Sequence, residues 1–381
     1  MRQCRLILIF FSFFLSCASH KQEDGLYVPD PGVMTKPQMR VQAKESREGY
    51  ECRYVEFSVA GTERIKAYLL VPDKASILRR CPAVLMLHDH GARFDIGKEK
   101  LVRPMASVLA KGVDDHIMHS SHQWIDKNFD GVYLADSLAS LGYVVLVADA
   151  LYWGERSSEE AQRWSELNFA DPDGGLSEGL SSKERKALIK ELKNKVYDGQ
   201  KLLYDSLYAD GVIWAEKMLR DDVASAQLLR SLPFVDRRNI GAFGFSMGAH
   251  RCWMLSAFCK DVKCGVALSW MTSLDREERM KPSDYSMAVM PMREKLDFGD
   301  IGIWLAPKPM LFLNGTSDHL FPKEKVEVAF SKLQSYYSDY NKADTEPSFE
   351  PLQTVFFNGG HHCGKDVQAH IVRFLDDNLI R

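Results

Sequence analysis

Six short apolar runs, most of them separated by longer helical patterns, constrain the fold of this chain more than any other feature. The first two are continuous and rich in Val and Leu, as in strands that are buried on both faces. Helical patterns cover about 197–231, 247–259, 322–338 and 365–379. Strands that alternate with helices predict an α/β fold with a mostly parallel, doubly wound sheet and helices on both faces. The runs are "PAVLMLH" (82–88), "YVVLVAD" (143–149), "NIGAFGF" (239–245), "CGVALSW" (264–270), "KPMLFLN" (308–314) and "LQTVFFN" (352–358).

Two further strands precede these runs. "CRYVEFSV" (52–59) and "RIKAYLLV" (64–71) alternate between apolar and polar residues, which predicts a half-exposed antiparallel hairpin. Two long segments, about 92–135 and 157–196, fit neither a strand nor a short connection, and we expect them to be insertions that cap a site or decorate the surface. One domain is expected over residues 46–381.

The first residues have the composition of an export signal. Two arginines precede an apolar run of about a dozen residues, which is too short to span a bilayer as a mature helix, and Ser16-Cys17 follows. Residues 1–17 are therefore predicted to be a lipoprotein signal with Cys17 lipidated; the alternative is signal cleavage without a lipid. Residues 18–45 are polar with prolines and are expected to form a flexible tether. The predicted location is the periplasm or cell surface of a bacterium, with the membrane contacted only through the lipid anchor.

Charge and cysteine usage exclude some classes of partner. The formal net charge is −3, with acidic and basic residues mixed along the chain, so nothing suggests a nucleic-acid partner. The six cysteines of the mature part lack the spacing of a zinc or thioredoxin-like motif, and their pairing cannot be read from the sequence. They are Cys52, Cys81, Cys252, Cys259, Cys264 and Cys363.

The stretch "GFSMG" (244–248) lies between a predicted strand and a predicted helix. This is the setting of a nucleophile elbow, in which a serine is held on a strained turn with its hydroxyl exposed. The residues two before and two after the serine must be small, and Gly244 and Gly248 meet that need. Ser246 is therefore the candidate nucleophile.

A serine hydroxyl needs a base to remove its proton, and the loop after the last strand supplies two candidates. "FFNGGHHCGKD" places His361 and His362 before the final helix. His361 is preferred because the glycine pair before it permits a tight loop, and His362 stays open as the alternative base. The third member must orient the imidazole. Asp318, just after an apolar strand, is the candidate acid unless it only caps the following helix, and Asp275 is the alternative acid.

Two backbone N–H groups are needed to stabilise an oxyanion. We expect them from Met247, which follows the nucleophile, and from His90 in the loop "HDHGA" (88–92). His88 and His90 could also be metal ligands, but no third ligand is evident nearby. A second cluster, "DDHIMHSSH" (114–122), has His116, His119 and His122 at helical spacing, and a solvated polar face is favoured there over a metal site.

Five motifs together resemble a known family. "LHDHG", "DALYWGER", "GFSMG", "NGTSDHLFP" and "GGHHCG" occur in the order seen in α/β-hydrolase esterases and look closest to the dienelactone hydrolase and acetyl xylan esterase-like group. The resemblance covers about residues 50–381. It implies an eight-stranded sheet, a triad of Ser246, Asp318 and His361, and no cofactor or metal. It also implies a structural role for Glu155 and Arg156.

The chain departs from this family at two positions. Asp89 replaces a glycine in the oxyanion loop, which puts the geometry of His90 in question. Ser246 stands where a true dienelactone hydrolase has a cysteine. Trp153, Trp270 and Met271 follow strand ends on the expected active-site side and are candidates for the substrate pocket, although core packing explains them equally well.

The combined prediction is a secreted serine hydrolase that cleaves a carboxylic ester through an acyl-enzyme. An acetyl ester on a polysaccharide is the substrate class that the resemblance suggests. Two alternatives stay open: a peptidase of the prolyl-oligopeptidase type, and a surface glycan-binding lipoprotein without catalysis.

Overall fold

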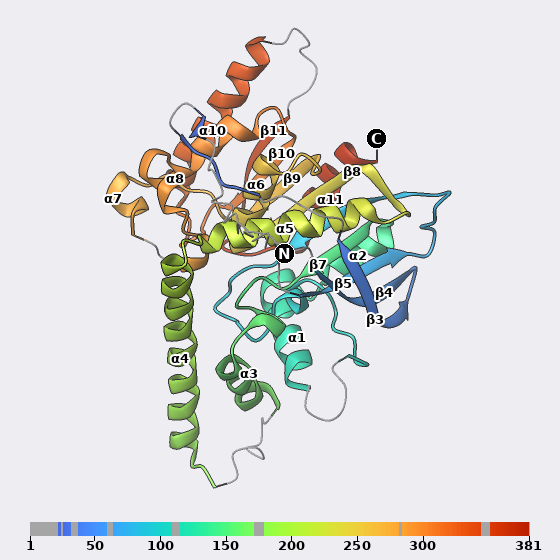
Figure 1. Cartoon of the computed structure of the whole chain (residues 1–381), viewed down its shortest axis with the longest axis vertical. Helices are drawn as coiled ribbons and strands as arrows, with labels where there is room; N and C mark the ends of the chain where they lie inside the picture. The colour runs from blue at the N-terminus through green and yellow to red at the C-terminus, as the bar shows by residue number, and fades with distance from the viewer. Residues whose placement is uncertain are drawn as a thin grey trace, which may run out of the picture.

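The chain folds around one large mixed sheet, as the computed structural model shows (Figure 1). The structure describes residues 22–23, 26–31, 37–58, 64–108, 115–170, 179–281, 284–343 and 351–380. Cys17 and the whole predicted signal lie outside these residues, as do 18–21, 24–25 and 32–36 of the predicted tether. None of the helices in the described ranges has the length and apolar character needed to cross a membrane.

Nine strands form the sheet, in the order β11-β10-β9-β8-β6-β7-β5-β4-β3. The strands from β6 to β11 are mutually parallel. On the other side of the sheet, β7 pairs antiparallel with β5, β5 with β4, and β4 with β3. A separate pair, β1 and β2, is also antiparallel. The strands are β1 (Gln22–Glu23), β2 (Leu26–Tyr27), β3 (Gln38–Arg47), β4 (Tyr50–Ser58), β5 (Ile65–Pro72), β6 (Cys81–Leu87), β7 (Val144–Ala148), β8 (Val235–Phe245), β9 (Cys264–Leu268), β10 (Met310–Gly315) and β11 (Leu352–Phe357).

Strand β3 corrects two expectations from the sequence. It begins at Gln38, so the prediction of a flexible tether to residue 45 is wrong for its last residues, and it adds a ninth strand to the eight that the resemblance implied. The strand lies at the edge of the sheet, and most of its residues are exposed or half-buried. Its apolar alternation is limited to Met39, Val41 and Ala43, and the other residues of the strand are polar, so the segment was included in the polar tether.

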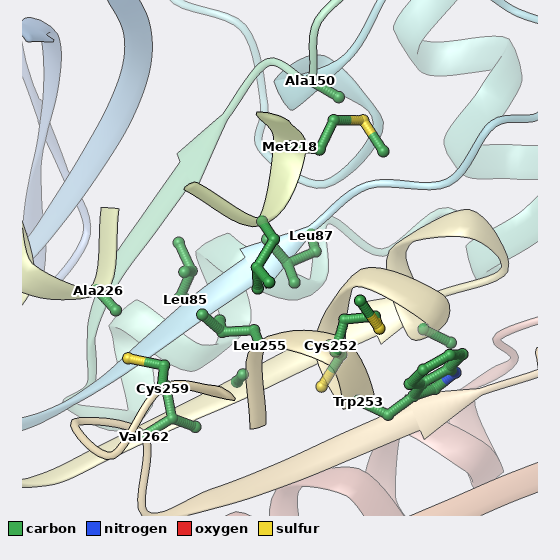
Figure 2. Close-up of a cluster of buried hydrophobic side chains, with 14 of the residues drawn as sticks. Leu85, Leu87, Ala150, Met218, Ala226, Cys252, Trp253, Leu255, Cys259 and Val262 are labelled. Atoms are coloured by element: carbon green, nitrogen blue, oxygen red, sulfur yellow. The ribbon is translucent and has the colours of Figure 1, made fainter. Parts of the chain in front are cut away.

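Helices cover both faces of the sheet. The apolar residues of β6 alternate: Leu85 and Leu87 pack with α5 and α6, whereas Val84 and Met86 pack with α1, α2 and α11. Figure 2 shows the first of these layers, which includes Leu85 and Leu87 of β6 together with Cys252 and Leu255 of α6. The α-helices are α1 (Asp115–Phe129), α2 (Leu134–Leu141), α3 (Glu159–Ser165), α4 (Ser182–Ala209), α5 (Trp214–Ser231), α6 (Met247–Phe258), α7 (Arg276–Arg279), α8 (Met290–Lys295), α9 (Gly302–Leu305), α10 (Lys323–Ala343) and α11 (Lys365–Leu379).

The two predicted insertions are helical. In their described parts, neither contains a strand; the first holds η1 and α1, and the second holds α3, η3 and the start of α4. A capping box of Ser181 and Glu184 begins α4, which projects away from the sheet beside α3 (Figure 1). The predicted helix over 197–231 is two helices, because Gly211, with φ of 72°, breaks the chain between α4 and α5. The short helical segments are η1 (Lys98–Lys100), η2 (Gly154–Arg156), η3 (Glu166–Ala170), η5 (Tyr285–Met287) and η6 (Phe298–Ile301).

Candidate active site

Ser246 joins the end of β8 to the start of α6. Its backbone has φ of 55° and ψ of −122°, a region that residues with a side chain rarely adopt. Its N–H donates to the carbonyl of Leu268 at 2.8 Å, which ties the turn to the neighbouring strand β9. Ser246 is half-buried between the buried residues Phe245 and Met247. The predicted strand–turn–helix setting and the strained serine are both present.

Gly244 and Gly248 are required by close backbone contacts. A Cβ atom built on Gly244 would lie 1.9 Å from the carbonyl oxygen of Gly248. A Cβ atom on Gly248 would lie 1.9 Å from the carbonyl oxygen of Leu87, at the end of β6. Any side chain at either position would push α6 away from the sheet, so the prediction that both positions must be small is confirmed.

Asp318 and His361 meet above the carboxyl ends of β10 and β11. These strands pair in parallel to their last residues, and the N–H of Ser317 donates to the carbonyl of Gly359 at 2.9 Å. The two loops are therefore joined, and His361 Nδ1 lies 2.8 Å from Asp318 Oδ2. Asp318 is buried, and its other oxygen accepts the N–H groups of Leu320 and Phe321 at 2.9 and 3.2 Å. The carboxylate therefore both orients the imidazole and stabilises the turn before α10.

The imidazole of His361 packs between two aromatic rings. Its centroid lies 4.9 Å from that of Phe245, the residue directly before Ser246, and 5.9 Å from that of Phe321. With Nδ1 bound to Asp318, Nε2 is the nitrogen left to accept a proton. Ser246 Oγ makes no hydrogen bond to the described residues, and the contact between nucleophile and base is often loose in an unliganded site.

The alternative base and the alternative acid have other partners. His362 Nε2 lies 3.0 Å from Asp130 Oδ1, on the loop after α1. Asp275 is exposed and caps the short helix α7, where it accepts the N–H of Glu278 at 2.8 Å. The structure brings Asp318 and His361 together and gives His362 and Asp275 structural roles.

Met247 and His90 present two backbone N–H groups near the nucleophile. Met247 is the first residue of α6, where helix geometry leaves N–H groups without an internal partner. Among the described residues, neither the Met247 N–H nor the His90 N–H has a hydrogen-bond acceptor. The loop that carries His90 lies against the start of α6, because a Cβ atom on Gly248 would also come within 3.0 Å of the His88 carbonyl oxygen. Unpartnered backbone donors of this kind could stabilise an oxyanion, and the assignment of His90 and Met247 to that role stays a prediction.

The side chains of His88 and His90 are engaged in the loop itself. His88 Nε2 accepts the N–H of Ala150 at 3.0 Å, so Nδ1 carries the proton and donates to the carbonyl of Asp89 at 2.9 Å. His90 Nδ1 accepts the N–H of Ala92 at 3.0 Å, which leaves Nε2 facing Asp284 Oδ2 at 3.5 Å. Burial lowers the pKa of both imidazoles. Each ring is a structural part of the loop rather than a free metal ligand.

Trp153, Trp270 and Met271 are all buried. Trp153 lies under the oxyanion loop and donates its indole N–H to the carbonyl of His90 at 3.1 Å. Trp270 packs 5.6 Å from Phe321, which in turn stacks on His361. Trp153 and Trp270 therefore support groups of the site, and any contact of these three residues with substrate stays a prediction.

The three histidines of α1 contact different groups. His116 is buried with Nδ1 3.1 Å from Ser165 Oγ, and His119 Nδ1 lies 3.1 Å from the carbonyl of Phe169. His122 packs on Tyr133. Over the described ranges, no three His, Cys, Asp or Glu side chains are grouped as metal ligands would be.

A segment that was not predicted from the sequence, residues 284–293, contacts both candidate oxyanion residues. Asp284 faces His90, and Ser286 Oγ, which bonds Asp284 at 2.6 Å, lies 3.6 Å from the sulfur of Met247. Arg293 of α8 donates to the carbonyl of Met287 at 2.8 Å, and burial lowers its pKa to about 10. This segment forms no strand and no long helix, so the periodicity of apolar residues could not indicate its structure.

Comparisons with known proteins agree with this architecture. No model of a known protein family matches the chain. A Bacillus subtilis (strain 168) protein named "Putative hydrolase YtaP" is 24% identical over 351 residues, which is 91% of this chain and 94% of that protein.

Among solved structures, an acetyl xylan esterase described as putative, from Bacteroides fragilis NCTC 9343, is similar with a TM-score of 0.58 and 15% identity, over 85% of this chain and 70% of that one. A glucuronoyl esterase from Solibacter usitatus has a TM-score of 0.55 and 11% identity, over 93% and 89% of the two chains. A methylesterase, BT1017, has a TM-score of 0.51 and 13% identity, over 91% and 58%. The chain therefore has the α/β-hydrolase fold, as its motifs predicted, with β3 added at the edge of the sheet.

Proposed function

We propose that this chain is a serine hydrolase that cleaves a carboxylic ester through Ser246, His361 and Asp318. The observation that carries the proposal is the pairing of Asp318 with His361 at 2.8 Å beside a strained serine at a helix N-terminus. No single part of this arrangement is specific. Together they provide a nucleophile, an oriented base and two free N–H donors.

Attack on the ester is the first step of the proposed reaction. Nε2 of His361 takes the proton of the Ser246 hydroxyl as its oxygen bonds to the ester carbonyl carbon. The carbonyl oxygen becomes an oxyanion, which the N–H groups of His90 and Met247 stabilise. Asp318 holds the imidazole in the required tautomer and stabilises its charged form.

Collapse of the tetrahedral intermediate completes the reaction. The alcohol leaves with the proton from His361, and the acyl group stays on Ser246. A water molecule, deprotonated by His361, then attacks the acyl carbon through a second oxyanion. The acid is released, and Ser246 regains its proton.

Acetyl esters of polysaccharides are the first substrates to test. Solved proteins with this fold include an acetyl xylan esterase, a glucuronoyl esterase and a methylesterase by name. These similarities concern the fold, so they guide the choice of a substrate panel and do not define the substrate.

We also propose that the enzyme is exported and anchored by a lipid on Cys17. The support is the sequence "MRQCRLILIFFSFFLSC" alone. Fractionation of cells that express the full chain tests it: the wild type should partition with membranes, and Cys17→Ala should not. Equal distribution of the two proteins would contradict the lipid anchor.

Hydrolysis of p-nitrophenyl acetate by the purified protein and its Ser246→Ala variant tests the esterase mechanism. We expect the variant to lose about 10³-fold or more in kcat with an unchanged thermal unfolding transition. Equal rates, or no turnover above background by the wild type, would contradict the proposed function.

A further inference from the structure

Lys100 is a fully buried lysine in the short helix η1, and it binds the oxyanion loop. Lysine is rarely buried completely unless its ammonium group has partners. Lys100 Nζ donates to the carbonyl of Asp89 and to the carbonyl of His90, each at 2.8 Å. The indole ring of Trp124 from α1 covers the ammonium group, with its centroid 5.3 Å from Nζ. A fully buried ammonium group must be stabilised by polar groups around it, and the two carbonyls are its closest partners.

The carbonyl of Asp89 and the N–H of His90 belong to the same peptide group. In a planar trans peptide these two groups point in opposite directions. Whatever holds the Asp89 carbonyl therefore also sets the direction of the His90 N–H. Two donors hold this carbonyl: Lys100 Nζ at 2.8 Å and His88 Nδ1 at 2.9 Å.

A simple ion pair with Asp89 is the main alternative role of Lys100. The nearest carboxylate oxygen of Asp89 lies 3.7 Å from Nζ, beyond hydrogen-bond distance. Both carboxylate oxygens are buried and have no hydrogen-bond partner among the described residues. The ammonium hydrogens are therefore directed at the backbone, and the carboxylate supplies only a nearby negative charge.

The left-handed turn after His90 makes the loop depend on such anchors. Gly91 and Ala92 have φ of 57° and 53°, and a Cβ atom on Gly91 would lie 2.3 Å from the ring of Trp124. The carbonyl of His90 also accepts the indole N–H of Trp153 at 3.1 Å. Three donors thus fix two successive peptide groups of a strained turn, and Lys100 is the one that contacts both.

We propose that Lys100 is a positioning residue that aims the His90 N–H at the oxyanion by holding the carbonyls of Asp89 and His90. The proposal rests on the proposed serine hydrolase function, because it assigns a role within that same site. It also accounts for Asp89 at a position where the family has a glycine. The hydrogen bonds from Lys100 and His88 fix the peptide group between Asp89 and His90.

The protonation of Lys100 gives this role a pH dependence. Burial lowers the pKa of Lys100 to about 8, although the nearby carboxylates of Asp89 and Asp95 act to raise it. Arg93 lowers it, and His88 contributes a neutral ring to the same loop. The ammonium group is therefore charged below about pH 8 and loses its proton above it. Because a neutral amine is a weaker donor, we expect kcat to fall as the pH rises through this value.

The test is Lys100→Met with Lys308→Met as its matched control, assayed on p-nitrophenyl acetate. Lys308 also donates to two backbone carbonyls, those of Ser256 and Cys259, and burial also lowers its pKa. Those carbonyls lie at the far end of α6, about 15 and 20 Å along the helix from Ser246. We expect Lys100→Met to lose about 10- to 100-fold in kcat with KM within about threefold, and Lys308→Met to keep the wild-type kcat.

An inhibitor that forms a tetrahedral adduct separates positioning from folding. A trifluoromethyl ketone with an acetyl-sized group should bind the Lys100→Met protein more weakly by the same factor by which kcat/KM falls. If Lys100→Met does not fold, Lys100→Arg keeps the charge and does not titrate. Its kcat should then lack the fall near pH 8 that the wild type shows.

The outcomes are distinct. A wild type without esterase turnover overturns the proposed function and the Lys100 role with it. A wild type that turns over, together with a folded Lys100→Met of unchanged kcat, overturns only the Lys100 role. An alkaline fall that persists in Lys100→Arg also overturns it.

Discussion

Replacing Gly248 by Ala perturbs the site through backbone contact alone. The new Cβ atom would lie 1.9 Å from the Leu87 carbonyl oxygen and 3.0 Å from that of His88, whereas ordinary van der Waals contact begins at 3.4 Å. Both neighbours are backbone atoms next to the oxyanion loop, so a side-chain rotation cannot relieve the clash. The start of α6 must therefore move away from β6 by about 1.5 Å, the difference between 3.4 and 1.9 Å.

This displacement separates the two residues of the proposed oxyanion site. Met247 moves with α6, while His90 stays with the loop after β6. A misplacement of about 1 Å costs on the order of 10²-fold in rate, and forcing a methyl group into a packed region costs about 1–3 kcal/mol of stability. We therefore expect Gly248→Ala to lose about 10²-fold in kcat/KM while staying folded.

Steady-state hydrolysis of p-nitrophenyl acetate and urea unfolding together test this prediction. Gly265→Ala in β9 is the control, because its Cβ atom would meet the side chains of Ser256 and Met310 at 2.5 and 2.9 Å, away from the site. It should lose stability to a similar extent but keep kcat/KM. Full activity in Gly248→Ala would refute the close contact of α6 with the oxyanion loop, and equal rate losses in both variants would refute its local origin.

Two further predictions concern the neighbouring histidines His361 and His362, and the ion pairs that Glu155 forms with lysines. His361→Ala should lose about 10³-fold or more in kcat, whereas His362→Ala, which only breaks the contact with Asp130, should stay within about tenfold; the reverse order would make His362 the base. Burial alone would raise the pKa of Glu155, but Lys98 and Lys66 overcome it and lower the pKa to about 2 from its ordinary 4.5. The stabilisation by Glu155 is therefore present above pH 4.5 and lost as the pH falls through about 2, so urea unfolding should show that Glu155→Gln costs less stability at about pH 3 than at neutral pH. An equal cost at both pH values would contradict the ion pairs.

Much of the sheet could be predicted because its strands are buried on both faces. Continuous apolar runs such as 82–88 and 143–149 have few alternative structures when turn residues bound them. The edge strand β3 was not predicted, since only Met39, Val41 and Ala43 alternate with polar residues in a strand that is otherwise polar. Most of the helical structure of the insertions was not predicted, because polar residues such as Lys98 and His116 are buried there beside apolar ones such as Ile117 and Ile125, which obscures the apolar period.

The residues of the candidate site also include some that could be predicted from the sequence and some that could not. Ser246, Asp318 and His361 were accessible from sequence because each follows a strand, and parallel strands bring their carboxyl ends to one edge. His362 was left as an alternative because spacing cannot show that its ring contacts Asp130. Glu155 and Arg156, for which the resemblance implies a structural role, form ion pairs with Lys98 and Asp221, which lie far from them in the sequence.

The contacts of Lys100 could not be predicted from any local sequence pattern. Its ammonium group binds carbonyls ten and eleven residues earlier in the chain, across a turn whose shape depends on Gly91 and Trp124. A lysine in "GKEK" reads as a solvated charge, and only its complete burial in the fold identifies it as part of the site.

Transfer of an acyl group to Ser246 can be observed by mass spectrometry of the acid-quenched protein after mixing with p-nitrophenyl acetate. We expect a single acetyl group on the peptide that contains Ser246 in the wild type, and none on that peptide in Ser246→Ala. Turnover without acetylation of Ser246, or acetylation of another residue at the rate of turnover, would contradict it.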